Sequence, residues 1–404
     1  MAIFGVVKKV SHIYMDYAAA TPVDEAVLAR MKKYWSEDFG NPGSIHDFGV
    51  SASRAVEQAR KDVAGVLGAR AEEVIFTSGG TESNNLAVLG AARAAKTREP
   101  NKKHHIIVSA IEHHSVLKSC EELACLRSQA HEGFEISYIP VGENGIVNPN
   151  DIKATIKANT ILVSVMYANN EVGAIQPIKE IARIIKKERA DGGVYPLFHT
   201  DACQAPGLLP IKTESLGVDL MTLSGAKIYG PKGSGILYVK KGTPISPIVF
   251  GGGQERGLRS GTPDVASIVG FAEALKIADV KREKESARLT ELRDYFISKL
   301  KSGVSNAELN GDEKARLPNN VNIYFPRADA EQFVIELDVA GFAVSAGSAC
   351  SSREEAPSHV LLALFGSEKR AMQSLRFTFG RNTAKKDIDA LLKAILSILP
   401  RIRA

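Results

Sequence analysis

Short apolar runs alternate with amphipathic segments from about residue 50 to residue 240. Apolar runs at 106–108, 161–165 and 196–198 predict buried strands, and the spacing of apolar positions predicts helices over 52–67 and 178–188. Strands that alternate with helices in this way indicate an α/β layer on a largely parallel sheet. Ligands bind such sheets at the carboxyl ends of the strands, so residues that follow strands are the first candidates for chemistry.

The pattern changes in the last third of the chain. A long helix is predicted over 264–300, a strand over 320–325 and a closing helix over 387–399. The closing helix should pack on the protein through one apolar face, formed by residues 388, 391, 392, 395, 396 and 399. We therefore expect a large domain over 16–275 and a small α+β C-terminal domain over 276–404, completed by the N-terminal segment 1–15.

Lys227 is the first candidate for chemistry. It follows the apolar run 218–223 and lies among small residues, in Ser-Gly-Ala-Lys-Ile-Tyr-Gly-Pro. Desolvation lowers the pKa of an amine, and a neutral amine can form a Schiff base with an aldehyde. The usual aldehyde for such a lysine is pyridoxal 5′-phosphate. A surface lysine in a glycine-rich turn is the alternative interpretation.

Two other segments supply what this cofactor needs. The strand-like segment 195–201 ends at Asp201, 26 residues before Lys227, and a carboxylate there would keep the pyridine nitrogen protonated. The alternative for Asp201 is a helix N-cap or a turn acid. A predicted strand over 74–77 leads through Ser-Gly-Gly-Thr into a helix, and such a helix start offers N–H groups to a phosphate.

Composition and charge fit a globular enzyme. The chain has 404 residues, 44% of them hydrophobic, and no apolar run approaches the length of a membrane span. The net charge of +5 is spread along the chain, without a nucleic-acid-binding stripe. The charged run 281–288 is interpreted as a solvated helix face. Four cysteines without a Cys-x-x-Cys pair favour a reducing cytoplasm, and Cys120, Cys125 and Cys203 are interpreted as structural.

A series of motifs, in order along nearly the whole chain, resembles the cysteine desulfurases. They are 15–22 (Met-Asp-Tyr-Ala-Ala-Ala-Thr-Pro), 39–42 (Phe-Gly-Asn-Pro) with His46, 77–83 (Thr-Ser-Gly-Gly-Thr-Glu-Ser), 112–113 (Glu-His), 169–171 (Asn-Asn-Glu), 201–204 (Asp-Ala-Cys-Gln), 259–262 (Arg-Ser-Gly-Thr), 347–350 (Gly-Ser-Ala-Cys) and 374–377 (Ser-Leu-Arg-Phe). The resemblance implies a fold-type I pyridoxal-phosphate enzyme of the class-V aminotransferase branch, with a mainly parallel sheet, a smaller domain and a homodimeric assembly.

The resemblance also implies cofactor-binding roles. Lys227 would hold the cofactor and then carry protons, Asp201 would pair with the ring nitrogen, and His113 would stack on the ring and help to move protons. The alternative for His113 is a structural or surface histidine. The remaining implied contacts are Gln204 with the phenolic oxygen, Asn170 with the same edge or the substrate, Gly80, Thr81 and Ser224 with the phosphate, and Thr262 with a phosphate across a dimer interface. The family usually has histidine at the position of Ala226, so one phosphate ligand is missing here.

Two residues would act on the substrate. Arg376 is expected to bind the substrate carboxylate through two parallel hydrogen bonds, and Arg381 is the competing candidate. Cys350 lies in Ser-Ala-Gly-Ser-Ala-Cys-Ser-Ser, a run of small residues that lets a loop move. Its thiolate could attack the sulfur of bound cysteine. Without the other motifs, Cys350 would be interpreted as a free loop thiol.

These residues predict a cysteine desulfurase that converts L-cysteine to L-alanine and a persulfide on Cys350. The resemblance implies that the sulfur passes to an iron–sulfur scaffold or a tRNA-thiolation relay, with no metal site beyond an iron–sulfur cluster shared transiently through Cys350. No direct contact with nucleic acid or membrane is expected. Two alternatives stay open: another pyridoxal-phosphate enzyme, such as a selenocysteine lyase or an aminotransferase, and a non-catalytic scaffold for sulfur-trafficking partners.

Overall fold

A seven-stranded sheet forms the centre of the molecule in the computed structural model, which describes residues 12–125, 134–189, 193–347 and 357–403. The strands that are neighbours in the sheet run parallel, except that β8 is antiparallel to both of its neighbours. The prediction of a largely parallel sheet is confirmed. In spatial order the strands are β2 (Val74–Thr77), β8 (Gly235–Val239), β7 (Leu220–Ser224), β6 (Leu197–Asp201), β5 (Thr160–Ser164), β3 (His104–Ser109) and β4 (Phe134–Ile139).

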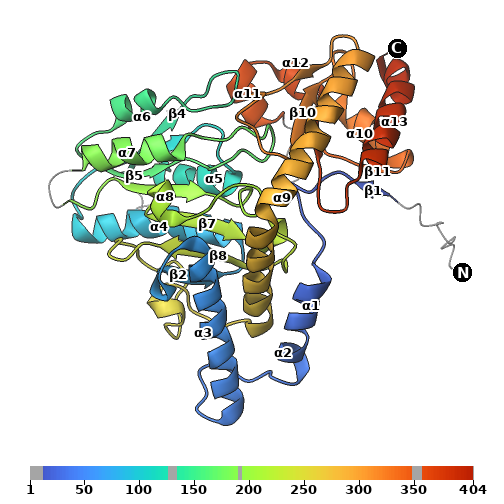
Figure 1. Cartoon of the computed structure of the whole chain (residues 1–404). Helices are drawn as coiled ribbons and strands as arrows, with labels where there is room; N and C mark the ends of the chain where they lie inside the picture. Colours follow the sequence, from blue (N-terminus) through green and yellow to red (C-terminus); the bar gives the residue numbers. More distant parts are fainter. Residues whose placement is uncertain (1–11, 126–133, 190–192, 348–356, 404) are drawn as a thin grey trace, which may run out of the picture.

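Helices cover both faces of this sheet (Figure 1). The helices α3 (Asp47–Leu67), α7 (Ile178–Glu188) and the first half of α9 (Val265–Gly303) share one core with the sheet, while α4 (Gly80–Arg98) and α5 (His114–Ala124) share the other. Successive strand residues point to opposite faces, so Phe76 packs in the first core and Ile75 in the second. Burial on both faces explains why the strands appear in the sequence as continuous apolar runs.

A second, smaller layer is built on an antiparallel sheet of three strands. Its order is β12 (Ser374–Thr378), β10 (Asn320–Tyr324) and β9 (Glu308–Leu309). The second half of α9 packs with α10 (Ala330–Val339) and α13 (Lys385–Arg403) around this sheet. The N-terminal segment joins it through β1 (Ile13–Tyr14), which pairs with β11 (Phe342–Ala343).

The helix α9 links the two layers, as Figure 1 shows. Leu275 and Ala278 belong to the core that the large sheet shares with α3 and α7. Leu289 and Phe296 belong to the core around the three-stranded sheet. The side chains on α9 thus change core between Ala278 and Leu289, which is close to the predicted domain boundary. That boundary stays a prediction, because the helix runs through it without a break.

The predicted element types hold, and their ends differ for local reasons. The helix predicted from residue 52 begins at Asp47, because the ring of His46 accepts a hydrogen bond from the N–H of Gly49 and caps it. The strand predicted from 196 begins one residue later, since Pro196 has no N–H to donate. The other helices are short: α1 (Glu25–Met31), α2 (Lys33–Ser36), α6 (Pro149–Thr155), α8 (Thr213–Leu216), α11 (His359–Phe365) and α12 (Glu368–Ala371).

The charged run 281–288 has the predicted solvated face, and its other side contacts the protein. Lys281 and Lys284 are exposed, as a solvated face requires, but Arg288 turns inward. Its guanidinium donates to the carbonyl groups of Thr383 and Gly380 at 2.7 and 2.9 Å, and so ties α9 to the end of β12. One side of the run is therefore structural.

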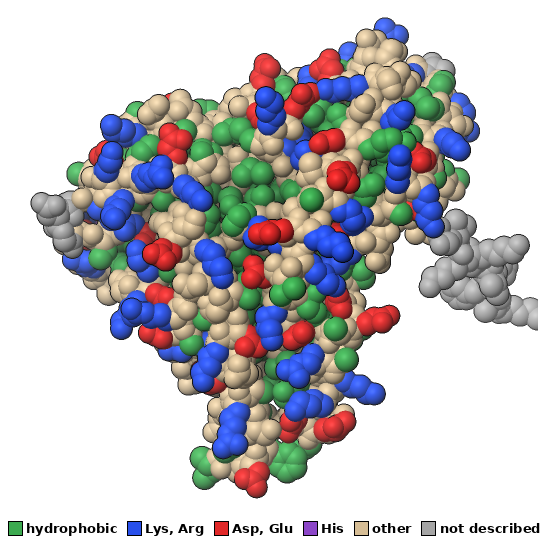
Figure 2. Space-filling view, in the orientation of Figure 1, with side chains coloured by type: hydrophobic (Ala, Val, Ile, Leu, Met, Phe, Trp, Pro, Cys, Tyr) green, Lys and Arg blue, Asp and Glu red, His purple; other side chains and the backbone are tan. Residues whose placement is uncertain are grey.

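The surface carries both signs of charge. In the face shown in Figure 2, lysine and arginine side chains are interspersed with aspartate and glutamate, as the sequence predicts. Within the described residues, every helix is too short or too polar to cross a membrane.

Candidate active site

The predicted site residues meet at one edge of the large sheet. The strands that end at this edge include β2, β3, β5, β6 and β7. The candidate functional residues lie at the ends of these strands or in the segments that follow them. A cavity of about 230 Å³ lies there. Ten predicted residues line it: Gly80, Thr81, His113, Asn170, Asp201, Gln204, Ser224, Ala226, Lys227 and Arg376.

Asp201 stands at the last position of β6, with 6% of its surface exposed. Its carboxylate accepts hydrogen bonds from the side chain of Asn84 at 2.7 Å and from the N–H of Cys203 at 2.9 Å. Asn84 also donates to the hydroxyl of Ser115, which contacts the ring of His113. A carboxylate held by such donors keeps one orientation, as a partner for a ring nitrogen must.

The turn before α4 suits a phosphate group. Gly79 has φ of 140°, which L side chains rarely adopt, and Gly80 has no room for a Cβ because that atom would lie 2.8 Å from Sγ of Cys203. Within the described residues, no side chain caps the start of α4. Its N–H groups and partial positive charge therefore face the cavity beside Thr81 and Ser224.

The N-terminal segment holds the loop that carries Lys227. The ammonium of Lys227 donates to the carbonyl of Ala19. Thr21 donates through its N–H and its hydroxyl to the carbonyl of Ala226, and its hydroxyl accepts from the N–H of Tyr229 at 2.8 Å. No role was predicted for the individual residues of the motif at 15–22. In the structure, Ala19 and Thr21 of this motif hold Lys227 and its loop through hydrogen bonds.

Arg376 is one of the largest fully buried side chains. Nη2 pairs with the carboxylate of Asp16 at 2.7 Å, and Nη1 donates to the carbonyl of Asn170 at 3.2 Å. Nε is buried and has no hydrogen-bond partner among the described residues. A free N–H on a buried guanidinium beside the cavity is the feature expected of a site for a carboxylate.

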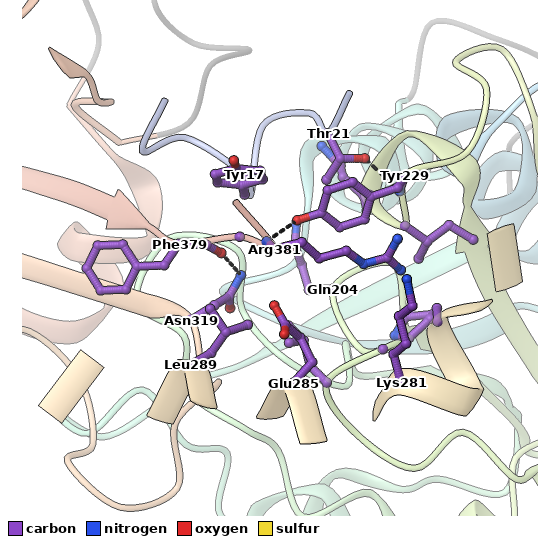
Figure 3. Close-up of a pocket in the computed structure, with 17 residues that line it drawn as sticks. Tyr17, Thr21, Gln204, Tyr229, Lys281, Glu285, Leu289, Asn319, Phe379 and Arg381 are labelled. Carbon is purple, nitrogen blue, oxygen red and sulfur yellow. Dashed lines mark hydrogen bonds between the residues drawn. The ribbon is translucent and has the colours of Figure 1, made fainter. Parts of the chain in front are cut away.

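The competing candidate, Arg381, lies elsewhere. It pairs with Asp24 at 2.9 Å and stacks on the ring of Tyr229, with 4.0 Å from Cζ to the ring centre. It lines a smaller cavity, of about 40 Å³. Figure 3 shows it there with Lys281 and Glu285, which belong to α9. Lys227 and Gln204 line both cavities, so the two are adjacent, but Arg381 lines only the smaller one.

Burial shifts the pKa of three groups in or near the site toward their neutral forms. Burial raises the pKa of the Glu112 carboxyl well above its usual range, and the nearby charge of Asp201 raises it further. Burial lowers the pKa of His199 to about 4, and this ring contacts the hydroxyls of Ser164 and Thr222. Burial also raises the pKa of the Cys203 thiol. These shifts disfavour a charge on the neighbours of Asp201, and the buried Cys203 fits its structural interpretation.

The arrangement fits pyridoxal 5′-phosphate. A lysine, a carboxylate, a histidine and an uncapped helix start line one cavity. Two buried polar atoms on its wall, Oδ1 of Asn84 and Nε of Arg376, lack partners within the part of the chain that the structure describes. An unpaired buried polar group is costly, and a ligand in the cavity would supply partners for both.

Among the described residues, one predicted site residue does not line this cavity. Thr262 is exposed and lines a different cavity, next to Ser78 and Arg259. Cys350 lies outside the described residues, so its predicted role stays a prediction. Of the other cysteines, Cys120 is buried in α5 and Cys125 is exposed at its end.

Sequence reasoning missed three contributors. Asn84 had a signal, because it lies one helical turn after Gly80 and so shares its face. Asp16 and Ala19 had none beyond the family motif, since their partners Arg376 and Lys227 are 360 and 208 residues away.

The comparisons with known proteins agree with this geometry. The family model described as Aminotransferase class-V matches residues 13–391. Cysteine desulfurase IscS of Dictyoglomus turgidum (strain DSM 6724 / Z-1310) is 46% identical over 391 residues, which cover 97% of this chain and 95% of that protein.

Solved structures share the fold and confirm the predicted fold class. A NifS-like protein superposes with a TM-score of 0.87 at 36% identity, and the match covers 96% of this chain and 100% of that chain. The protein described as SspA in complex with cysteine has a TM-score of 0.76 at 34% identity, over 91% of this chain and 98% of that chain.

Proposed function

Because this chain belongs to the class-V aminotransferase family and to the cysteine desulfurases within it, we propose that it removes sulfur from L-cysteine and leaves it as a persulfide on Cys350. The observation that carries the proposal is the single cavity lined by Lys227, Asp201, His113 and Arg376. One solved relative is described as a complex with cysteine, which supports the choice of substrate.

The residues around the cavity would hold pyridoxal 5′-phosphate. Lys227 would carry it covalently, Asp201 would face its ring nitrogen, and the start of α4 with Thr81 and Ser224 would bind its phosphate. His113 would lie against the ring, with Gln204 and Asn170 at its edge. When bound, this group withdraws electrons from the substrate's Cα, which makes the Cα proton acidic.

Substrate positioning would fall to Arg376. Its free Nε and the second hydrogen on Nη2 would grip the carboxylate of cysteine in two parallel bonds. Burial makes this grip strong, because water does not compete for the guanidinium. Nζ of Lys227 would then take the proton from Cα and return protons to the product, a step worth roughly 10²–10⁴-fold when the base is well placed.

Cys350 would act as the nucleophile. Its thiolate forms a bond with the substrate sulfur while the bond between that sulfur and Cβ breaks. The electron pair of the broken bond stays on carbon, which takes up protons to become the methyl group of alanine. Cysteine and the thiol thus give alanine and the persulfide, with no external oxidant or reductant.

We further propose that the enzyme works as a homodimer. The exposed large apolar side chains include Trp35, Phe39, Ile45, Phe48 and Phe250. In Figure 2 hydrophobic side chains reach the surface at the lower tip of the molecule, where α3 begins. Such patches mark interaction sites, and a second copy would place its Thr262 on the cofactor phosphate.

The persulfide would pass to an iron–sulfur scaffold or a tRNA-thiolation relay. The names of the relatives support an acceptor of this kind but do not distinguish the two. A free thiol that must cycle through a persulfide requires a reducing compartment, so we propose that the enzyme works in the cytoplasm.

The test is turnover of L-cysteine by the holoenzyme, with alanine and sulfide measured together in the presence of a reductant. The wild type should release both in equal amounts, and Cys350→Ala should release neither. Cys125→Ala is the matched control, because that exposed thiol should be dispensable. Turnover indifferent to Cys350 would favour another pyridoxal-phosphate enzyme, and a protein that binds no cofactor would favour a scaffold.

A further inference from the structure

The chain segment that carries Cys350 leaves and returns at one buried carboxylate. Cys350 lies between Gly347 and Ser358 in the sequence. The hydroxyl of Ser358 donates to Oε2 of Glu171. A Cβ built on Gly347 would lie 3.7 Å from that same oxygen and 3.7 Å from Cβ of Ser358. The two ends of the segment therefore meet at Glu171.

The departing end is fixed by the strand that carries Arg376. The N–H of Arg376 donates to the carbonyl of Ser345 at 2.7 Å, and the N–H of Ser345 donates back at 3.3 Å. The hydroxyl of Ser345 donates to the carbonyl of Gly347 at 3.1 Å. Gly347 itself has φ of 81°, so the turn toward Glu171 depends on a glycine.

The returning end is fixed by a helix start. The hydroxyl of Ser358 accepts from the N–H of Leu361 at 3.1 Å and so caps α11. The ring of the next residue, His359, lies 4.5 Å from that of His114, and its Nε2 is 2.9 Å from the carbonyl oxygen of Glu112. One hydroxyl thus links the helix to the edge of the large sheet.

The backbone of Glu171 is fixed by hydrogen bonds at both its N–H and its carbonyl. It is 1% exposed, its N–H donates to the side chain of Asn169 at 2.8 Å, and its carbonyl accepts from Asn322 at 3.1 Å. The carbonyl of the preceding residue, Asn170, accepts from Arg376. Asn170, which holds Arg376, and Glu171, which binds Ser358 and lies beside Gly347, are therefore consecutive residues of one turn.

We infer that Glu171 is a positioning residue for sulfur transfer. Its carboxylate fixes where the segment that carries Cys350 begins and ends, and so sets the position from which the thiol approaches the substrate. The inference rests on the proposed function. Among the described residues Glu171 does not line the cofactor cavity, so it acts through the segment rather than on the substrate. A displacement of about 1 Å between reacting groups can cost roughly 10²-fold in rate.

The experiment separates the two halves of the reaction in the holoenzyme. Exchange of the Cα proton of L-alanine in deuterated water reports on Lys227 and Arg376 and needs no Cys350. Transfer of sulfur to Cys350, followed by quenched-flow mass spectrometry after one addition of L-cysteine, reports on the segment. Glu171→Ala should slow sulfur transfer by about tenfold or more and change the exchange rate by less than about twofold.

Two further variants complete the test. Glu171→Gln keeps an oxygen that can accept from Ser358 and should recover most of the transfer rate. Ser367→Ala is the matched control, because Ser367 caps the neighbouring helix α12 in the same way but does not contact Glu171. It should leave both rates unchanged.

Several results would overturn the inference. They are parallel losses of exchange and transfer in Glu171→Gln and Glu171→Ala, equal transfer rates in Glu171→Ala and the wild type, or a loss in Ser367→Ala as large as that in Glu171→Ala. A wild type that exchanges the Cα proton but never places sulfur on Cys350 would instead refute the proposed function, so the two failures are distinguishable.

Discussion

Replacing each of two arginines with lysine tests which one recognises the substrate. Arg376 lines the cavity, and its Nε has no partner among the described residues. Arg381 instead forms an ion pair with Asp24 and stacks on the ring of Tyr229. Lysine keeps the positive charge of Arg376 but loses the parallel pair of hydrogen bonds. A hydrogen bond to a charged group is worth about 1.5–3 kcal/mol, so a loss of about 2 kcal/mol, or roughly thirtyfold in affinity, is expected for Arg376→Lys.

The assay is the steady-state rate of alanine formation across a range of L-cysteine concentrations. Arg376→Lys should raise KM with a smaller change in kcat, because the carboxylate does not change charge during the reaction. Arg381→Lys should lower the melting temperature, since it weakens the link between α1 and the end of β12, and leave KM unchanged. A rise in KM for Arg381→Lys with none for Arg376→Lys would refute the assignment.

Three other predictions concern residues in or near the cavity. His199 has a pKa of about 4 in the fold against an ordinary 6.5, so the unfolded chain binds more protons between these values and stability falls as the pH drops. His199→Gln should make the loss of unfolding free energy between about pH 7 and pH 5 smaller by about 2 kcal/mol, measured by urea unfolding at each pH; an unchanged loss would contradict the pKa. Gly80→Ala places a Cβ 2.8 Å from Sγ of Cys203 and should cost about 1–3 kcal/mol, and the added replacement Cys203→Ala should recover part of this in thermal unfolding; no recovery would locate the clash elsewhere. Ala226→His should tighten binding of pyridoxal 5′-phosphate to the apoenzyme by roughly tenfold, since a hydrogen bond to a charged group is added, and no gain in a fluorescence titration would count against the phosphate cradle proposed here.

The parts of the fold that could be predicted are those governed by local periodicity. The strand at 74–77 and the helix at 178–188 have the predicted bounds, because buried strands and amphipathic helices differ in their repeat. The reversed direction of β8 was not predicted. Its sequence is as apolar as those of the parallel strands in the same sheet, and the direction of a strand depends on how the chain connects, which the repeat does not encode.

The candidate site divides in the same way. Residues that follow strands, such as Asp201 and Lys227, could be found because parallel strands bring their carboxyl ends together. The Asp16–Arg376 pair could not, since 360 residues separate its members and neither has a local signature. The family motif favours Arg376 over Arg381, and the structure adds that Arg376 lines the cavity with Lys227 and Asp201 whereas Arg381 does not.

The most direct measurement of the central claim is the mass of the Cys350 peptide after the holoenzyme has met one equivalent of L-cysteine without a reductant. The account predicts that this peptide gains one sulfur atom while an equal amount of alanine appears, and that the peptides containing Cys120, Cys125 and Cys203 are unchanged. Alanine formed without sulfur on Cys350, or sulfur on another cysteine, would contradict it.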